Sequence, residues 1–88
     1  MTVYVDPLTD WGWRLGPSCH MFTDSKDLSE LHSAAAKIGL RRAWFQEHRL
    51  APHYDLNKNR RRVAVAAGVV EVDRQRAVEI WRARRASL

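Results

Sequence analysis

The chain is poor in cysteine, glycine and proline, and it contains no long hydrophobic run. Its 88 residues include one cysteine, four glycines and three prolines. A single thiol excludes an internal disulfide and suits a reducing compartment. No apolar stretch approaches the roughly 18 residues of a membrane-spanning helix, and the chain does not open with a basic region and an apolar run. We therefore expect a cytoplasmic protein without a membrane partner.

Acidic residues are also in deficit. Ten Asp and Glu residues stand against 15 Lys and Arg, 12 of them Arg, and the formal net charge is +5. This balance favours phosphate-bearing partners, whether nucleotides or nucleic acid. A solvated surface rich in arginine has the same composition, so charge alone does not decide between these interpretations.

The length predicts one domain, residues 1–88, with no room for a second. A chain of this size buries only roughly 60–65% of the surface that it exposes when unfolded, so its core is small. The hydrophobic share of 45% is typical of globular proteins. Because a small sheet leaves two open edges, a homodimer that completes the core stays an alternative.

Three segments predict strands: 2–6 (TVYVD), 41–46 (RRAWFQ) and 69–72 (VVEV). Each is short, rich in β-branched or aromatic residues, and bounded by turn residues. Residues 7–24 contain two prolines and two glycines and show little periodicity, which predicts a long loop.

Three further segments predict helices. Apolar residues recur at helical spacing from Leu28 to Ile38, and Gly39 follows at the position of a left-handed C-terminal cap. A second helix is expected over about 57–67, and a third after Asp73. The basic tail at 83–88 is expected to fray.

The resulting order is β-α-β-α-β-α, which predicts a small α/β domain with a three-stranded, mostly parallel sheet and packed helices. In parallel sheets, ligands bind outside the carboxyl ends of the strands. This rule collects candidate ligand-binding residues from the loops after the first two strands, namely Asp6, Trp11, Trp13, His20, Gln46, His48, His53, Tyr54 and Asp55. Trp11 or Trp13 could stack on a nucleobase.

The triplet His53-Tyr54-Asp55 is the most concentrated group of functional side chains. An imidazole at the ligand-binding edge can act as a general acid or base. Asp55 has a structural alternative, because either it or Asn57 could cap the following helix. Tyr54 could simply anchor the loop with its ring. Arg60 and Arg61 at that helix start could neutralise phosphate, or lie on an exposed basic turn.

His20 offers a second imidazole, which could pair with His53 for phosphodiester cleavage. Its neighbour Cys19 carries no signature of a cysteine hydrolase and is expected to be a buried thiol. A metal site could use Asp6, His20, His53 and Asp55, but no tight ligand spacing supports it. Trp44 and Trp81 are expected in the core.

Six stretches of the chain carry a resemblance to a known family. In chain order they are VYVD, CHM, ELH, RRAWFQ, HYDL and RRRVAVAAGVVEV, spread over residues 2–81. Together they resemble the small bacterial and phage family catalogued as domain of unknown function 4031. The resemblance implies that the characteristic residues are Asp6, His20, Trp44, Phe45, Gln46, His53, Tyr54 and Asp55. It supports a site but no reaction, because the family has no established activity to transfer.

Three functions follow as hypotheses. The first is binding, with hydrolysis as a further step, of a nucleotide or other phosphate compound, in which His20 and His53 act as acid and base and Asp55 orients an imidazole. The second is a non-catalytic module that binds nucleic acid or protein through an arginine-rich face. The third is a metal-dependent hydrolase, which is weakened by Pro7, because the resemblance implies an acidic residue there. The sequence specifies no cofactor.

Overall fold

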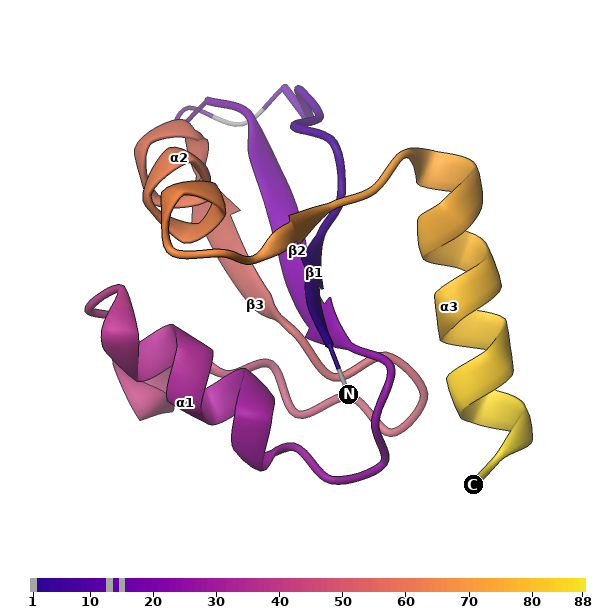
Figure 1. Ribbon diagram of the computed structural model, residues 1–88. Helices are drawn as coiled ribbons and strands as arrows, with labels where there is room; N and C mark the ends of the chain where they lie inside the picture. Colours follow the sequence, from indigo (N-terminus) through magenta and orange to yellow (C-terminus); the bar gives the residue numbers. More distant parts are fainter. Residues whose placement is uncertain (1, 13, 15) are drawn as a thin grey trace.

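The computed structural model describes residues 2–12, 14 and 16–88. These residues form a four-stranded mixed sheet in the order β3-β2-β1-β4 (Figure 1). The strands are β1 (Val3–Val5), β2 (Ser18–Thr23), β3 (Tyr54–Asn57) and β4 (Val70–Glu71). β2 pairs antiparallel with both β1 and β3, and β1 pairs parallel with β4.

The helices lie on both faces of the sheet. They are α1 (Ser29–Lys37), the short 3-10 helix η1 (Arg42–Trp44), α2 (Lys58–Ala66) and α3 (Arg74–Ala86). α1 and α2 cover one face, and α3 covers the other alone (Figure 1). The domain therefore has three layers, and its buried residues divide into two clusters, one on each side of the sheet.

The alternation of side chains along the strands explains the two clusters. In β2, Cys19 and Met21 are buried against the face of α1 and α2, whereas Phe22 is buried against α3. In β3, Tyr54 and Leu56 are buried on the first face, whereas Asp55 and Asn57, which alternate with them, are exposed. Successive side chains of a strand point to opposite faces, so each strand contributes to both layers.

Local sequence features determine where the helices begin and end. The side chains of Asn57 and Asp73 accept hydrogen bonds from backbone N–H groups three residues further on, at 2.8 and 2.7 Å. Asp55, the other candidate for the α2 cap, lies in β3 and does not cap the helix. Gly39 and Gly68 follow α1 and α2 with φ of 81° and 99°, which glycine adopts without strain.

The predicted sheet needs correction. It has four strands instead of three, and only the β1–β4 pair is parallel. Residues 18–23, assigned to a long loop, form the longest strand, and residues 41–46 form η1 and its flanks instead of a strand. Residues 54–57, which were assigned to a loop and the start of a helix, form the strand β3 instead. β2 was missed because its apolar and polar residues alternate only loosely, behind a glycine and a proline.

Two tryptophans expected in the core differ from each other. Trp44 is 42% exposed, with the guanidinium carbons of Arg41 and Arg60 at 5.8 and 5.0 Å from its ring centre. The core prediction for Trp44 is therefore wrong. Trp81 is half-buried and stacks on Phe22, with ring centroids 4.4 Å apart.

The basic tail, which was expected to fray, is mostly helical in this structure. α3 continues to Ala86, and Arg84 is buried, with its Nε donating to the carbonyl oxygen of Ser25 at 2.7 Å. This bond ties the end of α3 to the segment between β2 and α1. Among the described residues, no helix is long and apolar enough to span a membrane.

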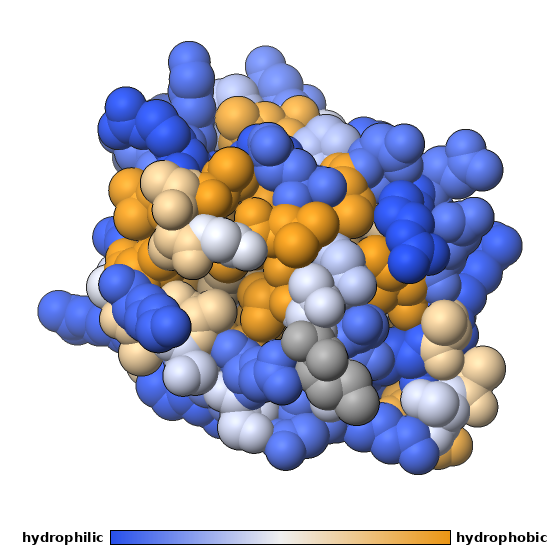
Figure 2. Space-filling model, viewed as in Figure 1, coloured by the Kyte–Doolittle hydropathy of each residue, from blue (hydrophilic) through white to orange (hydrophobic). Residues whose placement is uncertain are grey.

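Hydrophobic side chains also reach the surface. Figure 2 shows them gathered in the middle of one face, with hydrophilic side chains around them. Val70 of the edge strand β4 is 43% exposed. An open sheet edge of this kind is compatible with the homodimer alternative, which stays a prediction.

The docking of α3 onto the sheet can be tested with two substitutions on the same helix. Ile80 is 3% exposed and packs with Phe22 and Ala77, so Ile80→Ala should lower the free energy of unfolding by about 2–5 kcal/mol. Val78 is 41% exposed, so Val78→Ala should change it by less than about 0.5 kcal/mol. Urea denaturation measures both. Equal effects would contradict the packing of α3 described here.

Candidate functional site

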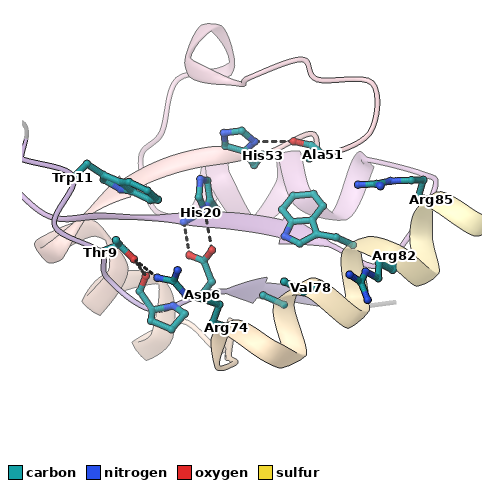
Figure 3. A pocket seen from close by; sticks show the side chains of 13 residues that line it. Asp6, Thr9, Trp11, His20, Ala51, His53, Arg74, Val78, Arg82 and Arg85 are labelled. Atoms are coloured by element: carbon teal, nitrogen blue, oxygen red, sulfur yellow. Dashed lines mark hydrogen bonds and ion pairs between the residues drawn. The ribbon is translucent and has the colours of Figure 1, made fainter.

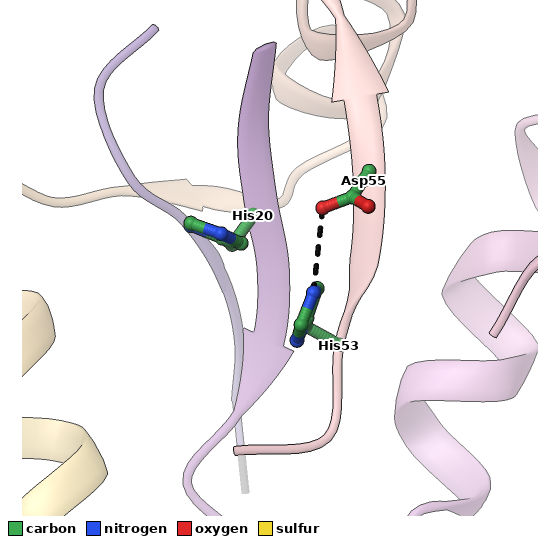
Figure 4. Close-up of side chains that lie close together, drawn as sticks. All are labelled: His20, His53 and Asp55. Atoms are coloured by element: carbon green, nitrogen blue, oxygen red, sulfur yellow. Dashed lines mark ion pairs between the residues drawn. The ribbon is translucent and has the colours of Figure 1, made fainter. Parts of the chain in front are cut away.

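Pairing between β2 and β3 brings the main candidate side chains together on the α3 face of the sheet. His20 lies directly opposite Asp55, and His53 precedes Asp55 by two residues and so lies on the same face (Figure 4). The imidazole centroids of His20 and His53 are 4.8 Å apart, with perpendicular rings. His53 Nε2 lies 3.3 Å from Asp55 Oδ1. The contact arises from neighbouring antiparallel strands, and not from parallel strand ends as expected.

Asp6, directly after β1, holds His20 with both carboxylate oxygens. Oδ1 accepts the backbone N–H of His20 at 2.7 Å, and Oδ2 lies 2.8 Å from the ring Nδ1. Because a carboxylate accepts, Nδ1 carries the proton and Nε2 points away from Asp6. The hydrogen bond that His20 donates to Asp6 raises the pKa of His20, burial opposes this, and the negative charges of Asp6 and Asp55 add to the increase.

His53 is oriented in the same way by the backbone. Its Nδ1 lies 2.7 Å from the carbonyl oxygen of Ala51. A carbonyl can only accept, so Nδ1 carries the proton and Nε2 faces Asp55. Both imidazoles are thus held by their Nδ1 atoms, and both leave Nε2 available on the same face.

A pocket of about 540 Å³ lies between this face of the sheet and α3 (Figure 3). Its walls come from the segment after β1, the middle of β2, the segment before β3, and α3. It is lined by Asp6, Pro7, Thr9, Trp11, His20, Ala51, His53, Arg74, Ala77, Val78, Trp81, Arg82 and Arg85. The two histidines therefore line a cavity large enough for a small molecule.

One face of α3 supplies positive charge to the pocket. Arg74, Arg82 and Arg85 follow each other at intervals of eight and three residues, which places them on one side of a helix. Arg74 donates to the hydroxyl of Thr9 at 3.3 Å. Sequence analysis missed all three arginines. Only Arg85 lies in the tail that was expected to fray, and Arg74 and Arg82 were missed because the local sequence does not show which layer this helix face packs against.

Two indole rings lie near the imidazoles. The Trp11 ring centroid is 6.3 Å from that of His20, and the Trp81 centroid is 6.5 Å from that of His53. Trp11 was expected at the site, whereas Trp81 was assigned to the core alone. Trp13, the alternative stacking residue, lies outside the described residues.

The remaining candidate residues do not line the pocket. Gln46 pairs with His53 through backbone hydrogen bonds, and His48 accepts backbone N–H groups within its own exposed loop. Arg60 lies over the ring of Trp44. Arg61 donates to the backbone oxygen of Asp6 at 3.0 Å and pairs with Glu71 at 2.9 Å. Arg61 thus holds the backbone of Asp6 without lining the pocket.

Tyr54 and Cys19 point into the opposite core. Tyr54 is buried, and its hydroxyl lies 2.8 Å from Nδ1 of His32. This placement fits the anchoring alternative for Tyr54 and separates it from the pocket. Burial, with the nearby charge of Asp6, raises the pKa of Cys19 to about 12, so its thiol is protonated at neutral pH. Cys19 is a buried thiol, as expected.

Comparison with known proteins identifies a family but no activity. The family described as "Protein of unknown function (DUF4031)" matches residues 3–84. The chain belongs to this family. The match covers His20, His53, Asp6, Asp55 and two of the three pocket arginines, Arg74 and Arg82. Among curated proteins and solved structures, none matches the chain significantly.

His32 gives a prediction on pH dependence. Burial, with the charge of Arg42, lowers the pKa of His32, so the folded protein binds a proton at this ring less readily than the unfolded chain does. The unfolded chain binds a proton near pH 6.5, so stability from this group is present above that pH and is lost as the pH falls below it. On acidification from about pH 7.5 to about pH 5.5, His32→Gln should lose less stability than the wild type.

Urea denaturation at each pH measures this difference. His20 titrates in both proteins, so its contribution cancels in the comparison. Equal losses in the two proteins would show that His32 is not held neutral by its surroundings.

Proposed function

We propose that this protein binds a nucleotide or a related phosphate compound in the pocket between the sheet and α3. The observation that carries the proposal is the composition of the walls. Three guanidinium groups from α3 share one cavity with two imidazoles and two indole rings. This combination suits a ligand with an anionic group at one end and a flat ring at the other.

The arginines support an anionic ligand. Guanidinium groups match phosphate oxygens with two parallel N–H donors, and they stay charged at every physiological pH. The one carboxylate that lines the pocket, Asp6, already accepts two hydrogen bonds from His20. The remaining charge of the pocket is therefore positive, in keeping with the net charge of +5 for the chain.

The indole rings support a flat group on the same ligand. Trp11 and Trp81 lie on the lining, and stacking of a base on an aromatic side chain contributes about 1–3 kcal/mol. The volume of about 540 Å³ is in the range of small-molecule sites. The pocket thus suits a mononucleotide better than a long nucleic acid.

The imidazoles would allow hydrolysis of a phosphate ester. One Nε2 would accept the proton of the attacking water, while the other ring would give a proton to the leaving oxygen. Asp6 orients His20, and the carbonyl oxygen of Ala51 orients His53. Asp55 Oδ1 lies 3.3 Å from Nε2 of His53, a distance that supports the proposed orienting role when that nitrogen carries a proton.

A nucleic-acid module using exposed arginines is the alternative function. Its best surface is Trp44, but two guanidinium groups, those of Arg41 and Arg60, already lie over that ring. This arrangement favours the pocket as the ligand site. The same experiment below separates the two functions.

The proposal can be tested by calorimetry with AMP, ADP, ATP and inorganic phosphate, and in a separate titration with long single-stranded DNA at two salt concentrations. Arg82→Gln should weaken nucleotide binding about 10-fold to 100-fold, because it removes a charged hydrogen bond to phosphate. Arg76→Gln is the matched control, since Arg76 lies on α3, pairs with Glu79 and does not line the pocket. Its affinity should equal that of the wild type.

Three results would contradict the proposal. They are the absence of binding to all four compounds, equal weakening by both arginine variants, and binding of only long nucleic acid with a steep dependence on salt. The last result would favour the nucleic-acid module.

A further inference from the structure

We infer that His20, His53 and Asp55 form a binding site for a divalent transition-metal ion of the Zn²⁺ type. Each residue offers one donor atom, and the three atoms lie within 4.8 Å of one another. His20 lies in β2, Asp55 in the paired strand β3, and His53 directly before β3, so the backbone holds them at a fixed spacing. The inference goes beyond the proposed function, because it concerns an ion and not the binding of the phosphate ligand. With the ion bound, both Nε2 atoms are ligands and take no part in the acid–base step described above.

The spacing of the donor atoms is close to that of a metal site. Bonds of about 2.0–2.2 Å in tetrahedral geometry separate neighbouring ligand atoms by roughly 3.3–3.6 Å. His53 Nε2 and Asp55 Oδ1 are already 3.3 Å apart. His20 lies further from them, within the 4.8 Å limit, so a movement of roughly 1–1.5 Å would bring its donor into place. A rotation of one side chain supplies such a movement.

The hydrogen bonds behind the two imidazoles also fit metal ligation. Histidines that bind metals donate their other ring N–H to a carboxylate or a carbonyl oxygen, which fixes the tautomer and the ring orientation. His20 donates to Asp6 at 2.8 Å, and His53 donates to the carbonyl oxygen of Ala51 at 2.7 Å. Two different hydrogen-bond acceptors thus hold the two rings by Nδ1 and leave both Nε2 lone pairs for another partner. The three side chains lie on or directly before neighbouring strands, close together (Figure 4).

The contact between His53 Nε2 and Asp55 Oδ1 would be stabilised by a positive charge between the two atoms. With its proton on Nδ1, a neutral His53 presents a lone pair to the carboxylate of Asp55, and two acceptors repel each other at 3.3 Å. A proton on Nε2 would relieve this pair alone. A cation bound between the two would relieve it and would use the nearby lone pair of His20 as well.

The ligand set indicates the type of ion. Two imidazoles and one carboxylate suit Zn²⁺ and similar first-row metals, and three protein ligands are typical of sites that keep a position for water or substrate. His20 and His53 both line the pocket, so the open position faces the cavity and its arginines. A phosphate oxygen in the pocket could reach that position.

The experiment is a titration of the protein with Zn²⁺ alone, followed by calorimetry, and with Co²⁺, followed by visible absorption. One ion per chain should bind, and Co²⁺ should show the absorption bands of a low-coordinate site. No phosphate compound is present, so the result does not depend on the proposed function. A wild-type protein that binds Zn²⁺ but binds no nucleotide would refute the proposed function and leave the metal site standing.

Substitution by asparagine isolates the ligand atoms. The amide nitrogen of Asn occupies about the position of Nδ1, so His20→Asn and His53→Asn can keep the hydrogen bonds to Asp6 and Ala51 while removing Nε2. Each should weaken Zn²⁺ binding by more than the roughly 10–100-fold that loss of a hydrogen-bond partner of a ligand costs. Asp55→Asn should act in the same direction. Asp6→Asn should fall within that 10–100-fold range, because Asp6 only orients His20.

The matched control is His48→Asn. His48 is exposed, and its Nδ1 accepts two backbone N–H groups, which the amide oxygen of Asn can also accept. Zn²⁺ affinity should not change in this variant. The inference is overturned if the wild type binds no stoichiometric Zn²⁺, or if His48→Asn weakens binding as much as His53→Asn does.

A measurement on the wild type covers the case in which a variant does not fold. When Co²⁺ is added to protein labelled with ¹⁵N, the ring signals of His20 and His53 should shift or broaden at lower Co²⁺ concentrations than the signals of other residues. Effects confined to His48 or to other exposed residues would overturn the inference.

Discussion

The antiparallel pairing of β2 with β3 is the constraint on which both the core and the site depend. Its register places Tyr54 opposite Met21 in one layer, and Asp55 opposite His20 in the other. Because side chains alternate with a period of two, a slip of one residue would exchange the two sets. Tyr54 and Leu56 would then face the pocket, and Asp55 would enter the apolar core without a partner. Burial of Tyr54 and Leu56 thus also holds the imidazoles in place.

α3 both buries part of this face of the sheet and forms a wall of the pocket. On its own, the face would expose Phe22, and the helix covers that ring with Ala77, Ile80 and Trp81. The hydrogen bond from Arg84 to Ser25 holds the far end of the helix. The helix covers only part of the face, so the imidazoles stay accessible and a cavity remains beside them. Packing of the second layer therefore also creates the pocket.

Much of the fold follows from local signals. The structure confirms the helix starts predicted at Asn57 and Asp73 and the helix ends predicted before Gly39 and Gly68. Such caps can be predicted because each involves only residues that are close in the chain. β1 and β4 were also predicted close to their observed bounds. β2 was not, since its Cys, His and Met have little strand preference of their own, and the strand forms because it lies between two others. A strand was predicted at Trp44 and Phe45 because aromatic residues favour strands. In the structure, Trp44 is the last residue of the short helix η1, and Phe45 follows it directly.

The sequence by itself determined the ends of α1 and α2, the starts of α2 and α3, the family, and the residue types from which a site could be built, including Asp6, His20, His53 and Asp55. Only the tertiary structure decided which of them meet, because a strand register is set by burial between segments more than 30 residues apart. It also decided that Tyr54 and Arg61 lie away from the pocket, and that three arginines of α3 line it. A helical face acquires a role only when another layer packs against it, and that contact is absent from any local stretch of the chain.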